Sequence, residues 1–149
     1  MRFALPDKVA ERLVLDGSTA VNAALVDGAF TGWEDIGLYA PTLLWSEAAS
    51  GIAQMRWRGE ISDHQAAAAV DRLLAAPIEF VPSRELVAAA TALAREFGWA
   101  KTYDAEYVVL AKRLTVPLMT LDARLAERAR RYVDVVSPLD IQRQLGISG

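Results

Sequence analysis

Residues 13–18 read LVLDGS, an apolar run that ends in an acid, a glycine and a serine. Leu13–Leu15 predicts a buried strand, because short apolar runs bounded by turn residues are typical of strands covered on both faces. Asp16 then lies at the carboxyl end of this strand. Ligands of open α/β sheets bind outside that edge, so Asp16 is a candidate functional residue. Its alternative role is to start a turn or to cap the helix expected over Ser18–Asp27, for which Ser18 is also a capping residue.

The same alternation of strand and helix continues along the chain. We expect strands at Leu13–Leu15, Leu38–Ala40, Ile78–Val81, Leu118–Leu121 and Val133–Val136. Helical patterns with start and stop signals separate them, at Ser18–Asp27, Thr42–Trp57, Ser62–Ala75, Ser83–Phe97, Thr102 or Asp104 to Arg113, Ala123–Arg131 and Leu139–Leu145. Strands that alternate with helices imply crossover connections and a mostly parallel sheet. We therefore predict an α/β fold of three layers, α/β/α, with about five short strands in a single domain over residues 1–149.

Length, composition and charge restrict the function. The 149 residues suit one domain, and 53% hydrophobic with 23% charged residues is a globular composition. The chain has no cysteine and one histidine, His64, which excludes a thiol nucleophile and zinc sites built on cysteine or several histidines. Oxygen ligands remain, and these favour Mg²⁺, Mn²⁺ or Ca²⁺. The formal net charge of -3 means that binding of nucleic acid requires local basic patches or a bridging cation.

The chain gives no sign of membrane association. It contains no run of about 18 uninterrupted apolar residues, so we expect no transmembrane helix. Met1–Arg12 carries charges throughout and lacks the apolar core of a signal peptide. We expect a cytoplasmic protein, and we assign no function to residues 1–12.

Asp122 repeats the pattern of Asp16. It follows the expected strand Leu118–Leu121, so both acids come directly after apolar strands of a parallel sheet. Because the carboxyl ends of parallel strands share one edge, the two acids belong to the same edge of the sheet. The alternative role of Asp122 is to cap the helix Ala123–Arg131.

Two further acids lie in expected helices. Glu47 shares a helix face with Leu43, Leu44 and Gly51, at spacings of four, three and four residues. An unpaired charge on an apolar face is costly, so Glu47 needs a partner or a cation, unless it reaches solvent or pairs with an arginine. Asp104 opens a helix, where the macrodipole stabilises an acid and keeps its carboxylate ionised and able to bind a cation. Capping alone would also explain Asp104.

Convergence of these acids would require compensation. Each pair of carboxylates repels by roughly 4 kcal/mol at about 4 Å and an effective dielectric constant near 20. Such a cluster is tolerable when a cation neutralises it or when some acids take up protons. An oxygen-only pocket suits Mg²⁺ or Mn²⁺, which acidify a bound water and stabilise charge on a phosphoryl group. The residues therefore indicate hydrolysis of a phosphodiester or phosphate ester.

At these residues the sequence resembles PIN-domain ribonucleases, most closely the VapC-type toxins of bacterial toxin–antitoxin pairs. The segments that carry the resemblance are, in order, VLDGS at 14–18, PTLLWSE at 41–47, YDAEY at 103–107 and LMTLD at 118–122. Together they cover nearly the whole chain, from about Leu13 to Leu139. The sequence departs from the family in its first ten or so residues and at Gly17, where a larger small residue is common.

The resemblance implies a PIN-like α/β/α fold and a Mg²⁺- or Mn²⁺-dependent endoribonuclease that hydrolyses RNA. The acidic quartet that would hold one or two metal ions and carry catalysis falls on Asp16, Glu47, Asp104 and Asp122. Ser18 and Thr120 match positions that orient the acids. The resemblance further implies the toxin of a type II toxin–antitoxin system. Such a toxin is a homodimer, forms a tight complex with a small VapB-type antitoxin, and contacts DNA only through that complex.

Basic and aromatic residues near the acids are candidates for holding RNA. Cations that could bind flanking phosphates are Arg56, Arg58, Lys101, Arg124, Arg128, Arg130 and Arg131. Solvated helix surface is the alternative for each of them. The four tryptophans, Trp33, Trp45, Trp57 and Trp99, could stack on bases or pack in cores and interfaces.

A second hypothesis belongs to another functional class. The chain could be a PIN-like module that binds a partner without catalysis. The intact acidic quartet favours the enzyme, and metal binding separates the two hypotheses. His64 follows Ser62 and Asp63 at a polar helix start, where an exposed histidine is a better interpretation than a catalytic triad.

Overall fold

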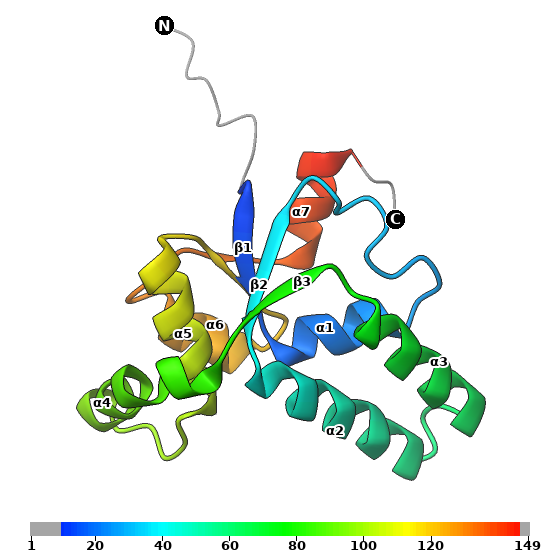
Figure 1. The fold of residues 1–149 in the computed structure, drawn as a ribbon, viewed down its shortest axis with the longest axis horizontal. Helices are drawn as coiled ribbons and strands as arrows, with labels where there is room; N and C mark the ends of the chain where they lie inside the picture. The colour runs from blue at the N-terminus through cyan, green and yellow to red at the C-terminus, as the bar shows by residue number, and fades with distance from the viewer. Residues whose placement is uncertain (1–9, 147–149) are drawn as a thin grey trace, which may run out of the picture.

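The computed structural model describes residues 10–146, which form a central sheet with helices on both sides (Figure 1). In chain order the elements are β1 (Arg12–Leu15), α1 (Gly17–Ala24), β2 (Gly37–Pro41), α2 (Leu43–Trp57), α3 (Asp63–Leu74), β3 (Ile78–Val81), the short 3₁₀ helix η1 (Ser83–Glu85), α4 (Val87–Phe97), α5 (Tyr103–Leu114), β4 (Leu118–Met119), α6 (Ala123–Ala129), β5 (Val135–Val136) and α7 (Pro138–Leu145).

The sheet has five parallel strands in the order β3-β2-β1-β4-β5, which confirms the predicted α/β fold. Val14 in the central strand β1 pairs with Tyr39 of β2 on one side and with Leu118 of β4 on the other. The chain builds the β2–β3 half first and the β4–β5 half afterwards, so the strand order reverses between β1 and β4. The carboxyl ends of β1 and β4 therefore flank the crevice at which open α/β sheets bind ligands.

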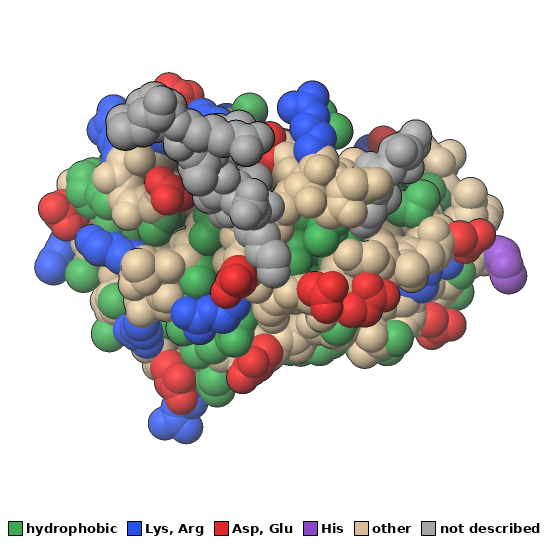
Figure 2. All heavy atoms as spheres, turned by 90° about the horizontal axis from the view of Figure 1, so that it is seen from above, with side chains coloured by type: hydrophobic (Ala, Val, Ile, Leu, Met, Phe, Trp, Pro, Cys, Tyr) green, Lys and Arg blue, Asp and Glu red, His purple; other side chains and the backbone are tan. Residues whose placement is uncertain are grey.

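Helices cover the two faces of the sheet in separate groups. α1, α2 and α3 pack against one another on one side, and α4 packs on α5 on the other (Figure 1). Figure 2 shows the molecule from the amino ends of the strands, where acidic and basic side chains are interspersed. Among residues 10–146, every helix is too short or too polar to traverse a lipid bilayer.

The core is centred on β1 and on small residues of the helices beside it. Leu13–Leu15 is fully buried, and α1 buries Ala20 and Ala24 completely. Small side chains also let α1 and α2 approach closely. A Cβ atom added at Gly51 of α2 would lie 3.1 Å from Cγ2 of Val21 in α1, which leaves little room for a larger residue.

The β4–β5 half of the sheet is shorter than the sequence predicts. Strands over Leu118–Leu121 and Val133–Val136 are expected, but β4 and β5 contain two residues each. Thr120 follows β4 directly. Its backbone N–H still donates to the Val136 carbonyl of β5 at 3.3 Å, and its hydroxyl donates to the Asp16 carboxylate at 2.6 Å. The chain then turns into Asp122, the N-cap of α6.

Two helix starts differ from the first expectation. The sequence offers Ser18 as the cap of the first helix and Asp16 as the alternative, and the structure confirms the alternative: Asp16 is the N-cap of α1 and accepts from the backbone N–H of Thr19 at 3.0 Å. The sequence also predicts one helix from Ser83, whereas η1 precedes a separate α4. The Ser83 hydroxyl accepts from the backbone N–H of Leu43 at 3.1 Å, so it ties η1 to the start of α2 instead of capping its own helix.

Two adjacent leucines of α3 differ in burial, and their substitution tests the described packing of this helix. Leu73 is 1% exposed and Leu74 is 64% exposed. We expect Leu73→Ala to lower the free energy of unfolding by about 2–5 kcal/mol, because it removes buried methyl groups and leaves a cavity. Leu74→Ala should change it by no more than about 0.5 kcal/mol. Urea denaturation of both variants measures the difference, and equal losses would contradict the described packing of α3.

Candidate active site

The four candidate acids line one cavity of about 470 Å³ at the carboxyl ends of β1 and β4. Each comes from a different part of the chain: the turn after β1, helix α2, the first turn of α5 and the turn after β4. In that order they are Asp16, Glu47, Asp104 and Asp122. Residues up to 106 positions apart in sequence are thus brought to one crevice by the strand order. His64 lies elsewhere, exposed in the first turn of α3.

Asp16 is held by hydrogen bonds from three sides. It is only 4% exposed. Its carboxylate accepts from the hydroxyls of Ser18 at 2.8 Å and Thr120 at 2.6 Å, and from the backbone N–H of Thr19 at 3.0 Å. Burial raises the pKa of Asp16 above its ordinary value, and these hydrogen bonds oppose the rise. The two hydroxyls implied by the resemblance therefore do contact an acid, and they fix the direction of its carboxylate.

Glu47 has a tyrosine as its partner. The phenol of Tyr107, on α5, donates a hydrogen bond to Oε1 of Glu47. Burial raises the pKa of Glu47, repulsion from Asp104, Asp16 and Glu106 raises it further, and the tyrosine opposes the rise. Burial and the neighbouring acids also raise the pKa of Tyr107, which keeps the phenol protonated as the donor.

Asp104 and Asp122 form the other side of the cavity. Asp104 is half-buried, and its pKa is raised by burial and then by repulsion from Asp122 and Asp16. The guanidinium groups of Arg128 and Arg124 oppose that rise. Asp122 is exposed and caps α6, where it accepts from the backbone N–H of Arg124 at 2.9 Å. Asp122 therefore does cap α6, as the alternative interpretation held, and it lines the cavity at the same time.

Sequence reasoning missed two residues beside these acids. Tyr107 follows Asp104 by three positions in α5, so helical spacing places both on one face and could have identified it. Glu106 is 4% exposed, and its Oε1 atom is buried without a hydrogen-bond partner among the described residues. Its spacing of two from Asp104 points to a different face, so the sequence carries no signal for its burial.

Gly17 permits the close approach of Glu47. A Cβ atom added at Gly17 would lie 3.3 Å from Cβ of Glu47, closer than most such contacts. A larger residue there would press on the segment of α2 that carries the acid. The departure from the family pattern at this position thus has a local structural reason.

The chemistry of the donors fits a hard divalent cation. All four acids offer oxygen ligands, which Mg²⁺ and Mn²⁺ prefer. Burial raises the pKa of Asp16, Glu47 and Asp104, and repulsion from neighbouring acids raises that of Glu47 and Asp104 further, so a bound cation would favour the ionised carboxylates. Within residues 10–146, no three acidic or histidine side chains lie in an arrangement that could hold a metal ion as they stand. The fit therefore rests on donor type and charge.

A family match and one solved structure agree with the fold. The PIN domain family matches residues 14–131. The chain is similar to the crystal structure of PAE2754 from Pyrobaculum aerophilum, with 19% sequence identity, a TM-score of 0.73, and coverage of 93% of this chain and 99% of that one. A PilT N-terminus domain protein from the archaeon Sulfolobus solfataricus P2 matches at 11% identity and a TM-score of 0.46, covering 91% of each chain. No curated protein shows a significant match to the sequence.

Repulsion among the acids predicts a pH-dependent stability. A raised carboxyl pKa means that the folded protein binds protons more readily than the unfolded chain, so the destabilisation from these groups falls as the pH drops from 7 towards 5. In chelator at pH 7 we expect Asp104→Asn to be about 1 kcal/mol more stable than the wild type, because it removes a like charge. The gain should shrink at pH 5. Thermal denaturation at both pH values measures it.

An exposed acid of α3 provides the control for this prediction. Asp71→Asn changes the same charge away from the cavity, so its effect should stay within about 0.5 kcal/mol at either pH. An Asp104→Asn variant less stable than the wild type at pH 7 would contradict this prediction, because it would mean that the folded protein stabilises the ionised carboxylate of Asp104.

Proposed function

The chain belongs to the PIN domain family, whose members are generally nucleases. We propose that this protein is a Mg²⁺- or Mn²⁺-dependent endoribonuclease. The observation that supports this most strongly is the lining of one cavity by four carboxylates from four separate elements. A structural protein has little use for buried, mutually repelling acids, whereas perturbed acids in a cleft are typical of functional sites.

In this proposal the quartet holds one or two cations and the neighbouring hydroxyls position the quartet. The metal ligands would be Asp16, Glu47, Asp104 and Asp122. When bound, the cation neutralises the acids, acidifies water and stabilises charge on the phosphoryl group. Ser18 and Thr120 hold the Asp16 carboxylate from two directions, and Tyr107 holds that of Glu47. Fixed carboxylates lose less entropy when they bind a ligand.

The finer proposal concerns the biological role. The resemblance to VapC-type toxins supports a cytoplasmic toxin of a type II toxin–antitoxin system that acts as a homodimer. Its partner would be a small VapB-type antitoxin, and DNA would be contacted only through that complex. The alternative is a PIN-like module that binds a partner without catalysis, and the experiment below separates the two.

RNA cleavage tests the proposed activity. Purified protein, free of any antitoxin, is incubated with total cellular RNA in Mg²⁺, in Mn²⁺ and in chelator. We expect cleavage with either metal and none in chelator. Asp104→Asn should cut at least about 100-fold more slowly, because it removes a charged group on which the cation depends. Asp104→Asn, purified in the same way, therefore also controls for contaminating nuclease, and Asp71→Asn, outside the cavity, should cut like the wild type.

Metal binding gives a second measurement that needs no substrate. Mn²⁺ should raise the Tm of the wild type, since a ligand at 100 times its Kd stabilises the folded state by about 2.7 kcal/mol. Asp104→Asn should lose most of this gain. Neither cleavage nor stabilisation by Mn²⁺ in the wild type would contradict the enzyme and favour the binding module.

The hydrogen bond from Tyr107 to Glu47 predicts a positioning role. Tyr107→Phe removes one oxygen and frees Glu47, so we expect about tenfold more Mn²⁺ to be needed for half-maximal cleavage, with recovery at high Mn²⁺. Tyr103→Phe removes a phenol that is half exposed on the same helix and should change nothing. A loss of activity that high Mn²⁺ does not recover would argue against positioning of a metal ligand.

A further inference from the structure

A second cavity, of about 320 Å³, lies beside α6. We call it the aromatic–arginine cavity. It is built from the end of α4, helix α6 and the residues that follow each. Its lining residues are Phe97, Trp99, Arg124, Glu127, Arg128, Arg131 and Tyr132.

Aromatic rings make up much of its wall. The ring centroids of Phe97 and Tyr132 lie 4.5 Å apart, and Trp99 meets Tyr132 edge-on at 6.4 Å. The guanidinium of Arg128 lies 5.6 Å from the centre of the Trp99 ring. All three rings are only partly buried, so they are accessible to a ligand. The other three tryptophans are placed differently. Trp45 stacks on Phe80 at 4.3 Å, Trp33 is in the core, and Trp57 is exposed at the end of α2.

The cavity is positively charged in a protein of net charge -3. Three arginines line it against one acid, Glu127. Among residues 10–146, the ion pairs are Arg56–Asp63, Arg58–Glu60 and Arg72–Asp27. The lining arginines take part in none of them, so their hydrogen-bond donors remain available for a ligand.

The aromatic–arginine cavity adjoins the acidic cavity. Arg124 follows Asp122 by two residues and donates its backbone N–H to that carboxylate. Arg124 and Arg128 both act electrostatically on Asp104. A nucleic-acid strand bound at the acids would therefore reach the guanidinium groups of Arg124 and Arg128, and then the aromatic rings, as it continues towards α6.

We propose that the aromatic–arginine cavity binds a nucleotide of single-stranded RNA that flanks the cleaved bond. The base packs against Trp99 and Tyr132, while Arg124, Arg128 and Arg131 hold phosphates. Arginine forks suit phosphate, and aromatic rings suit bases of any sequence. An acidic peptide would satisfy the arginines but offers no planar group to the rings. The inference rests on the proposed ribonuclease function and adds a binding site beside the acids.

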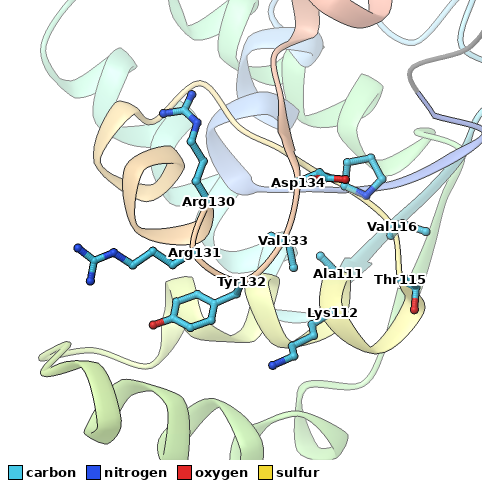
Figure 3. Close-up of a pocket in the computed structure, with 10 residues that line it drawn as sticks. Ala111, Lys112, Thr115, Val116, Arg130, Arg131, Tyr132, Val133 and Asp134 are labelled. Atoms are coloured by element: carbon cyan, nitrogen blue, oxygen red, sulfur yellow. The ribbon is translucent and has the colours of Figure 1, made fainter. Parts of the chain in front are cut away.

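Neighbouring arginines provide a matched pair for the test. Figure 3 shows the side chains of Arg131 and Tyr132 projecting to the same side of the chain, while Arg130 extends in another direction. A different cavity, of about 420 Å³, is lined by all three of these residues, whereas the aromatic–arginine cavity is lined by Arg131 and Tyr132 but not by Arg130. Arg130→Gln and Arg131→Gln make the same change of charge at adjacent, exposed positions.

Binding of a fluorescent oligouridine of about 12 nucleotides, measured by anisotropy in chelator, tests the proposal without cleavage. Arg131→Gln should raise the Kd and reduce the slope of log Kd against log salt by about 0.7, the value for one phosphate on a single strand. Trp99→Leu should raise the Kd at least about fivefold and leave the slope unchanged, because stacking does not depend on salt in this way. Arg130→Gln should alter the Kd less than twofold.

Several results would overturn the inference. These are no binding of oligouridine by the wild type, equal effects of Arg130→Gln and Arg131→Gln, no effect of Trp99→Leu, or equally strong competition by polyglutamate, which indicates a surface for an acidic protein. Failure of the ribonuclease proposal is distinguishable, because it appears as an absence of metal-dependent cleavage. Conversely, cleavage with unaltered binding in Arg131→Gln and Trp99→Leu would retain the enzyme and reject this cavity.

Discussion

The hydrogen bonds to the Asp16 carboxylate join the two halves of the structure. Thr19 attaches it to the start of α1, and Thr120 attaches it to the chain that leaves β4. The hydroxyl of Ser18 completes the set and also accepts from the backbone N–H of Leu121 at 3.2 Å. The backbone N–H of Asp16 also donates to the Met119 carbonyl at 3.2 Å, so the backbone and the carboxylate of this residue together fix the ends of β1 and β4 relative to each other. The cavity, the position of Asp122 and the direction of α6 all depend on that arrangement.

Charge within the cavity is compensated by different means. Asp16 is stabilised by hydrogen bonds, Glu47 by a phenol and Asp104 by the fields of two arginines. Asp122 stays near solvent at the start of α6. The pKa values of Asp16, Glu47 and Asp104 stay raised, and none of the four carboxylates forms an ion pair with a Lys or Arg among the described residues. Net negative charge is thus kept in the crevice, where a divalent ion would find its strongest attraction.

Much of the fold was accessible from sequence because its signals are local. Apolar runs such as Leu13–Leu15 mark buried strands, and their alternation with helical patterns requires parallel crossovers. The parts that sequence reasoning missed depend on contacts across the fold. β4 is shorter than predicted, and the hydroxyl of Thr120, the residue after it, donates to Asp16 at the end of β1. The pairing of Tyr107 with Glu47 joins α5 to α2, which no spacing along one helix reveals.

The unequal length of the strands has a consequence for how the protein can lose activity through local unfolding. β2 and β3 pair over four residue pairs, whereas β4 and β5 pair over two. Segments with few ladder bonds open locally at lower free energy than the rest of a domain. Opening of the edge strand β5 would free the Thr120 N–H from the Val136 carbonyl and loosen the turn that carries Asp122, while β1, β2 and β3 stayed paired. The acids of the site therefore lie in two regions that open at different free energies. Activity can be lost under mild stress before the domain unfolds globally, and it can return without refolding of the core.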